Sequence, residues 1–253
     1  MKQDVLSLQL YTVRDRMAED FAGTMRKVAE IGYGGVEIAG DGGLSASEMN
    51  SLLKSCGLIP VGSHIGIKVF NENFDEMAEY QHEIGNRYVT LPHIDIKSLD
   101  DAKNAAGILN GIGRRCSDAG LVFSYHNHDF EFRSYDGRIA YDVLLEETDP
   151  SYVFFQMDTC WVRFGGYDPC DYIRKYPRRF ITAHIKDMNI IDGKAVQTEV
   201  GKGIMDFRSI IPLLEEYGTE YLIIENDTCS IPTLESAAIS LRNMGVFINT
   251  NMI

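Results

Sequence analysis

Short segments rich in β-branched and aromatic residues alternate with longer amphipathic segments along the entire chain of 253 residues. Segments such as 59–64 and 180–185 predict buried strands, and the periodic segments that follow them predict helices. Strict alternation favours a parallel sheet, because two parallel strands need a crossover connection that is usually a helix. Eight such repeats, with no linker rich in Pro, Gly or Ser, predict an α/β protein with a single (β/α)8 barrel over residues 1–253.

Turn and capping signals set the limits of the predicted elements. The predicted strands are 6–13, 35–38, 59–64, 88–91, 122–126, 152–157, 180–185 and 221–224. The predicted helices are 20–31, 45–56, 74–84, 99–119, 141–147, 169–175, 207–217 and 234–244. The pair Asp192-Gly193 is typical of a tight hairpin turn, which predicts a small β-hairpin inserted around residues 189–200.

Composition excludes several classes of partner. The formal net charge of −13 repels nucleic acid and anionic membrane, because no basic excess is present to displace phosphate counterions. No apolar run approaches the ~20 residues that a membrane span needs, and the amino-terminal residues do not resemble a secretory leader. The five cysteines are scattered and form no CxxC pair, so we expect free thiols and a cytoplasmic protein.

Ionisable side chains gather where the predicted strands end. In a (β/α)8 barrel the carboxyl ends of the strands carry the chemistry. Five of the six histidines fall at such positions, and only His82 lies in a predicted helix. The strand-end residues are Glu37, His64, His93, His126, His128, Asp158, His184, Lys186 and Glu225.

Asp158, His184 and Glu225 follow three strands that are neighbours in the predicted sheet, and strand alternation turns them into the barrel. Two carboxylates and an imidazole in one row predict a site for one divalent metal ion, with Mn, Co, Mg, Fe or Zn as suitable ions. Each residue also has a simpler interpretation. Asp158 is placed to cap the next helix, His184 to be a buried hydrogen-bonded histidine, and Glu225 to be a neutralised buried carboxylate.

The other strand-end residues are candidates for substrate contact. Glu37, His64, His93 and Trp161 are expected to line the pocket, with Trp161 as a wall for a sugar ring. Structural hydrogen bonding or packing is the alternative for each of them. Lys186 is a candidate catalytic cation, and the alternative is an ion pair with Asp187.

Several motifs occur in an order that resembles a known family. They are Leu8-Gln9-Leu10-Tyr11-Thr12-Val13-Arg14-Asp15, Tyr125-His126-Asn127-His128-Asp129-Phe130-Glu131-Phe132, Asp158-Thr159, His184-Ile185-Lys186-Asp187-Met188 and Gly201-Lys202-Gly203-Ile204-Met205-Asp206-Phe207. Together they resemble the sugar phosphate isomerase/epimerase family of the xylose isomerase-like TIM barrel superfamily. The resemblance extends over nearly the whole chain, and it is specific to the family rather than to one substrate.

The resemblance implies one divalent metal held by Glu, Asp, His and Glu on successive strands. Asp158, His184 and Glu225 match this pattern, whereas the first glutamate is replaced by His126. The fourth ligand is therefore either His126 or Glu131, five residues further on, with a preference for Glu131. This departure puts in doubt simple epimerase chemistry, in which two glutamates on opposite faces of the sugar serve as acid and base.

The resemblance also implies a metal-dependent isomerase or epimerase that acts on a keto sugar or polyol through an enediolate. Glu131, His126 and His128 are the candidate bases, and Lys186 is a candidate proton donor or oxyanion partner. The alternatives are a dehydratase or lyase, resembling inosose dehydratase or 3-keto-glycoside-cleaving enzymes, and a catalytically silent binding subunit. The net charge argues against an apurinic endonuclease. A small carbohydrate is the expected partner, and a homodimer is considered because such barrels often pair.

Overall fold

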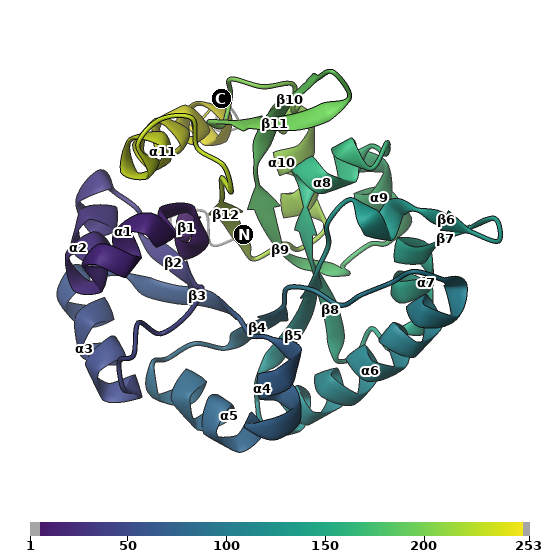
Figure 1. Ribbon diagram of the computed structural model, residues 1–253, viewed down its shortest axis with the longest axis horizontal. Coiled ribbons are helices and arrows are strands. Elements are labelled where there is room, and N and C mark those ends of the chain that lie inside the picture. Colours follow the sequence, from purple (N-terminus) through teal and green to yellow (C-terminus); the bar gives the residue numbers. More distant parts are fainter. Residues whose placement is uncertain (1–5, 250–253) are drawn as a thin grey trace.

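The computed structural model describes residues 6–249 and contains a closed parallel barrel ringed by helices, which confirms the predicted fold class (Figure 1). Around the barrel the strands follow the order β1, β2, β3, β4, β5, β8, β9 and β12, and β12 pairs with β1 to close the sheet. Their bounds are β1 Ser7–Gln9, β2 Gly35–Ile38, β3 Ile59–His64, β4 Tyr88–Leu91, β5 Val122–His126, β8 Val153–Asp158, β9 Phe180–Ile185 and β12 Tyr221–Ile224.

The helices cover the outside of the barrel, and their ends follow local chemistry. Ser45 and Glu48 form a reciprocal capping box at the start of α3, and Gly57 ends this helix with φ of 67°. The helices are α1 Arg14–Glu19, α2 Phe21–Ile31, α3 Ala46–Cys56, α4 Ile67–Glu72, α5 Phe74–Glu83, α6 Leu99–Asp118, α7 Ala140–Glu147, α8 Thr159–Phe164, α9 Pro169–Lys175, α10 Phe207–Glu216 and α11 Thr233–Asn249. Within residues 6–249, none of them is both long and apolar enough to cross a membrane.

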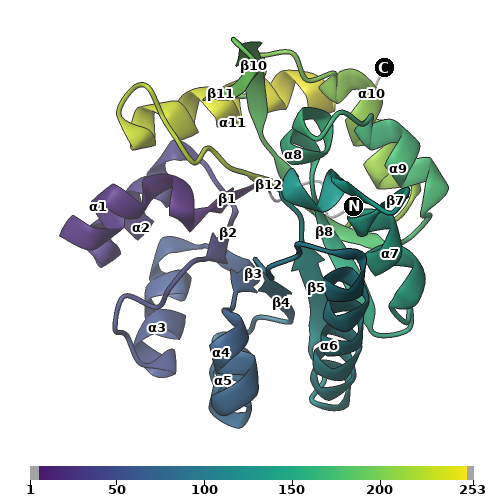
Figure 2. The same cartoon turned by 45° about the vertical axis from the view of Figure 1, so that its right-hand side comes forward.

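Two hairpins project from the barrel. Strands β10 (Asp187–Ile191) and β11 (Lys194–Thr198) are antiparallel and follow β9, close to the region 189–200 expected from the sequence. Figure 2 shows this hairpin beside α10 and α11. A second hairpin, β6 (Ser134–Tyr135) and β7 (Arg138–Ile139), was not predicted.

The first strand is shorter than expected. The sequence predicts a strand over 6–13, but β1 has three residues and the chain continues as the 3-10 helix η1 (Leu10–Val13). Gln9 explains the break, because its side-chain oxygen accepts a hydrogen bond from the Tyr11 amide and caps η1. A further 3-10 helix, η2 (Phe130–Phe132), follows β5.

The inside of the barrel is polar toward the carboxyl ends of the strands, here called the barrel mouth. The register places Gln9 beside Glu37, His126 beside Gln156, and Asp158 beside His184. A separate apolar cluster of Val61, Tyr88, Tyr221 and Ile223 fills the barrel interior, and Tyr88 and Tyr221 begin their strands. The apolar cluster closes one end, and the mouth holds the ionisable groups.

All five cysteines are free thiols, as the scattered spacing predicts. Cys116, Cys160 and Cys170 are buried, and burial raises the pKa of each of these thiols above its ordinary value. These cysteines are therefore small core residues rather than nucleophiles.

Candidate metal and substrate site

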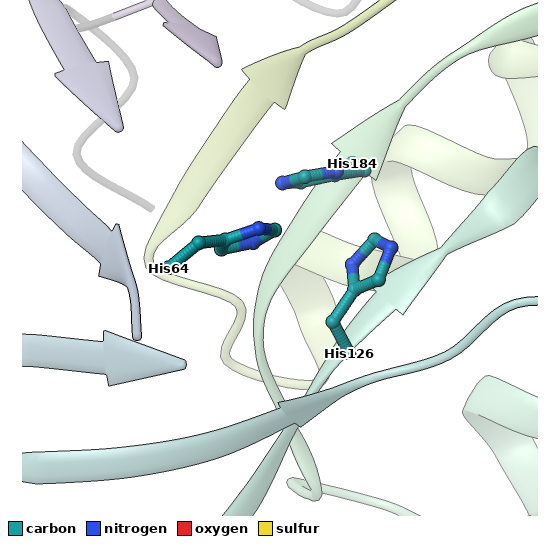
Figure 3. Close-up of side chains that lie close together, drawn as sticks. All are labelled: His64, His126 and His184. Carbon is teal, nitrogen blue, oxygen red and sulfur yellow. The ribbon is translucent and has the colours of Figure 1, made fainter. Parts of the chain in front are cut away.

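The carboxyl ends of β8, β9 and β12 bring Asp158, His184 and Glu225 together. One ligand atom from each residue lies within 4.8 Å of the others, and all three side chains are buried. His64, His126 and His184 form a second such group, and their rings lie close together at the mouth (Figure 3). His184 belongs to both groups and is therefore the centre of the site.

Both ring nitrogens of His184 meet carboxylates. Nε2 lies 2.6 Å from Glu37 Oε2, and Nδ1 lies 2.7 Å from Glu225 Oε2. Because a carboxylate only accepts, each nitrogen donates a proton and the ring is an imidazolium in this arrangement. Burial alone would lower the pKa of His184, but the Glu225 and Glu37 carboxylates outweigh it and raise the pKa to about 10.

Lys186 is buried among three carboxylates rather than paired with Asp187. Its Nζ lies 2.9 Å from Asp158 Oδ2, 2.7 Å from Glu225 Oε2 and 2.9 Å from Asp227 Oδ2. Burial opposes the charge on Lys186, but these three partners hold its pKa well above the ordinary value. The ammonium is thus a fixed positive charge at the mouth, because proton loss would leave the carboxylates unpaired.

Asp158 has two roles, one of which is the helix cap considered from the sequence. Its Oδ1 accepts a hydrogen bond from the Trp161 amide, 2.9 Å away, and caps α8. Its Oδ2 is buried, and no residue among 6–249 meets it in hydrogen-bond geometry, although Lys186 Nζ is close. Burial raises the pKa of Asp158, and the cations Lys186 and His184 only partly offset this effect.

The site has more acidic groups than basic ones, which suits a divalent cation. The carboxyl groups are those of Glu37, Asp158, Glu225 and Asp227, and the facing cations are Lys186 and His184. A buried cluster with excess negative charge is costly unless a further cation is bound. The oxygen and imidazole donors, including Asp158 Oδ2, which receives no hydrogen bond from residues 6–249, therefore fit the metal that the sequence predicts.

Glu131 lies apart from this cluster. Its carboxylate accepts hydrogen bonds from the Tyr125 hydroxyl, at 2.6 Å, and from the His128 amide, at 2.9 Å. Within the described residues it belongs to neither group of converging ligand atoms, whereas His126 belongs to the group with His64 and His184. Glu131 instead holds the loop after β5 in place.

The position of Glu131 has a measurable consequence for stability. Burial raises the pKa of Glu131 to about 7, although the hydrogen bonds from Tyr125 and His128 oppose the rise. The folded protein therefore keeps this proton at pH values where the unfolded chain has released it, and stability falls as pH rises through this window. Between about pH 5 and about pH 8 we expect the wild type to lose about 2.5 kcal/mol of unfolding free energy relative to Glu131→Gln. Urea denaturation of both proteins over this range measures the difference, and parallel pH profiles would contradict the expectation.

A cavity of about 570 Å³ opens at the mouth, which is within the usual range for small-molecule sites. Its wall includes five residues that the sequence singled out, namely His64, His126, His128, Lys186 and Glu225. Tyr11 and Asp227 also line it and were not predicted. A second cavity of about 360 Å³ shares His64 with the first, so this side chain stands between the two.

Three residues that the sequence predicts as substrate contacts do not line this cavity. Glu37 is fully buried beneath the cavity, where it accepts hydrogen bonds from Gln9, Gln156 and His184. His93 lies at the exposed rim, 3.2 Å from Asp95, and its ring contacts His128. Trp161 stands over Lys186 Nζ, with 5.4 Å between the amine and the ring centre. Gln156, which joins Glu37 to two histidines, was not recognised from the sequence.

The sequence profile of the xylose isomerase-like TIM barrel family matches residues 25–244. The chain belongs to this family. Sequence and structure thus agree on a xylose isomerase-like barrel. The candidate site lies at the strand ends, where (β/α)8 enzymes carry their chemistry.

Curated relatives are similar over part of their length. Inosose dehydratase of Geobacillus kaustophilus is 24% identical over 212 residues, covering 74% of this chain and 67% of that protein. Inosose dehydratase of Clostridium tetani is 28% identical over 168 residues, covering 59% of this chain and 55% of that protein. The chain therefore spans between half and two thirds of the length of these two relatives.

Solved structures match over nearly the whole chain. A sugar phosphate isomerase/epimerase from Parabacteroides distasonis is 25% identical with a TM-score of 0.82, covering 97% of this chain and 96% of that one. The IOLI protein with a binding zinc atom is 12% identical with a TM-score of 0.76, covering 97% and 98%, a likeness that shows the fold alone. These similar proteins bear the names of enzymes, namely a sugar phosphate isomerase/epimerase and inosose dehydratases.

Proposed function

We propose that this protein is a metal-dependent enzyme that removes the proton next to the carbonyl of a keto sugar or related polyol, with isomerisation or epimerisation as the outcome. The observation that carries the proposal is the convergence of Asp158, His184 and Glu225 beside a cavity of about 570 Å³. The named isomerase and epimerase among the structural neighbours support it.

Asp158, Glu225 and His184 would hold one divalent cation, with His126 rather than Glu131 as the fourth donor. Glu37 accepts a hydrogen bond from Nε2 of His184, so Nδ1, which faces Glu225, would hold the cation once it has released its proton. A bound cation supplies Lewis-acid polarisation of the substrate carbonyl and its neighbouring hydroxyl. Mn, Co, Mg, Fe and Zn all suit these donors, and a zinc atom in one structural neighbour is consistent with them.

His128 is the candidate base for the substrate proton. It lines the cavity, and no residue within 6–249 hydrogen-bonds its buried Nδ1. Burial and the nearby Lys186 lower the pKa of His128 to about 4, so the ring is neutral and able to accept a proton at neutral pH. Lys186, fixed among its carboxylates, places positive charge beside the oxygen that becomes negative.

Dehydration is the second candidate, and one observation favours it. The epimerase resemblance implies glutamates on opposite faces of the sugar, but Glu131 is bound to Tyr125 and the His128 amide away from the mouth. A single base that removes the proton and then returns it to the β-hydroxyl, which leaves as water, needs no opposed glutamate pair. The curated relatives named inosose dehydratase are consistent with this outcome.

One experiment separates the candidates. The purified protein is incubated with ketoses, 3-keto sugars and inososes in deuterated water with added Mn(II). Deuterium incorporation without loss of water supports the isomerase or epimerase, and a dehydrated product supports the dehydratase. A protein that retains no metal and exchanges no substrate proton would instead be a catalytically silent barrel, and the proposal would fail.

His128→Asn is expected to lower the rate of deuterium incorporation by a factor of about 10² to 10⁴, the usual contribution of a general base. His93→Asn is the matched control. It makes the same substitution in the neighbouring histidine at the rim, whose ring contacts His128. We expect its rate to stay within a few-fold of the wild type. Equal losses in both variants would show that His128 is not the base.

A further inference from the structure

Gln156 is the hub of the hydrogen bonds beneath the cavity. Its side chain on β8 is fully buried. The amide nitrogen Nε2 lies 2.6 Å from Glu37 Oε1 and 3.2 Å from Thr182 Oγ1. The amide oxygen Oε1 lies 2.7 Å from His64 Nε2 and 2.9 Å from His126 Nδ1. One amide thus connects a carboxylate on β2 with two histidines on β3 and β5.

The orientation of this amide follows from Glu37. Its Oε2 lies 2.7 Å from Gln9 Nε2 and 2.6 Å from His184 Nε2, so the Glu37 carboxylate acts as the acceptor for the groups around it. The Gln156 atom that faces Glu37 must therefore be the NH2 group. The reversed amide would place an oxygen against the carboxylate oxygen, with no proton between them.

The amide orientation then determines the protons on His126. Because Oε1 only accepts, Nδ1 of His126 carries the proton that it donates to Gln156. A neutral imidazole has one N–H group, so Nε2 of His126 is left with a lone pair. This atom lies 3.9 Å from Asp158 Oδ2, on the side of the candidate metal ligands. Figure 3 shows the His126 ring close to His184.

We propose that Gln156 is a positioning residue that holds His126 in the Nδ1–H tautomer and so presents its Nε2 lone pair to the cation at the mouth. The inference deepens the proposed function and rests on it for the cation. It also gives a physical reason why His126 can stand where the family pattern has a glutamate, because a neutral imidazole with the other tautomer offers no lone pair there.

The tautomer is measured directly in the metal-free protein. In the wild type with 15N-labelled histidine, two-bond 1H–15N correlations distinguish a protonated ring nitrogen from an unprotonated one. The signals of His126 are assigned by their loss in His126→Asn. We expect a protonated Nδ1 and an unprotonated Nε2. A protonated Nε2 with a free Nδ1 would overturn the inference whether or not Gln156→Met folds.

Gln156→Met keeps the length of the side chain and removes both hydrogen-bonding groups. We expect His126 to lose its single tautomer and the affinity for Co(II), titrated against a competing chelator, to fall about 10- to 100-fold, as when the partner that orients a metal ligand is removed. Thr182→Val is the matched control. It removes the hydroxyl that contacts Gln156 Nε2 but leaves Gln156 Oε1 facing His126. Its tautomer and Co(II) affinity should match those of the wild type.

The outcomes distinguish this inference from the proposed function. Unchanged Co(II) affinity in Gln156→Met, or an equal loss in Thr182→Val, would overturn the positioning role. A wild type that shows the Nδ1–H tautomer but binds no Co(II), Mn(II) or Zn(II) would overturn the proposed function while supporting the tautomer assignment. Binding of the metal together with the opposite tautomer would overturn this inference and leave the proposed function standing.

Discussion

Asp158→Asn is expected to abolish divalent-metal binding while the metal-free protein keeps its stability. The carboxylate oxygen Oδ2 is lost from the group that it forms with His184 and Glu225. Removing a residue that only orients a ligand weakens metal affinity about 10- to 100-fold, so loss of a ligand should exceed this range. Isothermal titration of Mn(II) into both proteins measures the difference.

Stability distinguishes loss of a ligand from general damage. Burial raises the pKa of Asp158, which means that its charged form is unfavourable in the metal-free fold. Asparagine still caps a helix, and Lys186 keeps the carboxylates of Glu225 and Asp227. We therefore expect the unfolding free energy of metal-free Asp158→Asn to lie within about 1 kcal/mol of the wild type.

Asp168→Asn provides the matched control for this experiment. Asp168 also caps a short helix, α9, through a hydrogen bond from the Cys170 amide, and it lies outside the ligand group. The same change there should leave Mn(II) affinity unaltered. If Asp158→Asn binds Mn(II) as tightly as Asp168→Asn does, Asp158 is a helix cap and Lys186 partner and not a metal ligand.

Much of the fold is encoded locally and was predicted from the sequence. Strands such as β3 and β5 have their predicted bounds, because apolar runs between turn signals define them. The six-residue helices α1, α4 and α8 were missed, since six residues are too few to show helical periodicity. The β6–β7 hairpin carried a readable signal. Asp136-Gly137 has positive φ angles of 51° and 79°, similar to the 50° and 71° of Asp192-Gly193.

The sequence predicted those site residues whose side-chain direction follows from strand alternation. It did not predict roles that depend on how deeply a side chain is buried or on its partners from other strands. Alternation turns Glu37 inward but does not reveal that it lies beneath the cavity against His184. Gln156 and Asp227 carry no ligand pattern in the sequence, and their roles follow from neighbours on other strands. An ion pair between Lys186 and Asp187 was the alternative considered for Lys186. That alternative is unfavourable because adjacent residues in an extended chain point to opposite sides.

Asp187 instead organises the loop between β11 and α10, which gives the largest expected effect on stability. Its buried carboxylate accepts hydrogen bonds from the amides of Met188, Gly201, Gly203 and Met205, at 2.9, 2.8, 2.9 and 3.2 Å. The loop can wrap this closely because Gly203 has no Cβ, which would collide with Asp187 Oδ1. The preceding hairpin in turn holds Asp227, the partner of Lys186, through Gln197.

Asp187→Ala removes the shared acceptor of four amides, so we expect a loss of about 3–5 kcal/mol in unfolding free energy. For a domain of this size that corresponds to a fall of roughly 10 °C in Tm, measurable by circular dichroism. Asp206→Ala is the control, because Asp206 caps α10 at the end of the same loop and its loss should cost only about 1 kcal/mol. Since the hairpin also supports Asp227, Mn(II) affinity should fall in Asp187→Ala but not in Asp206→Ala. Equal losses of stability in the two variants would show that the Asp187 carboxylate contributes no more than an ordinary helix cap.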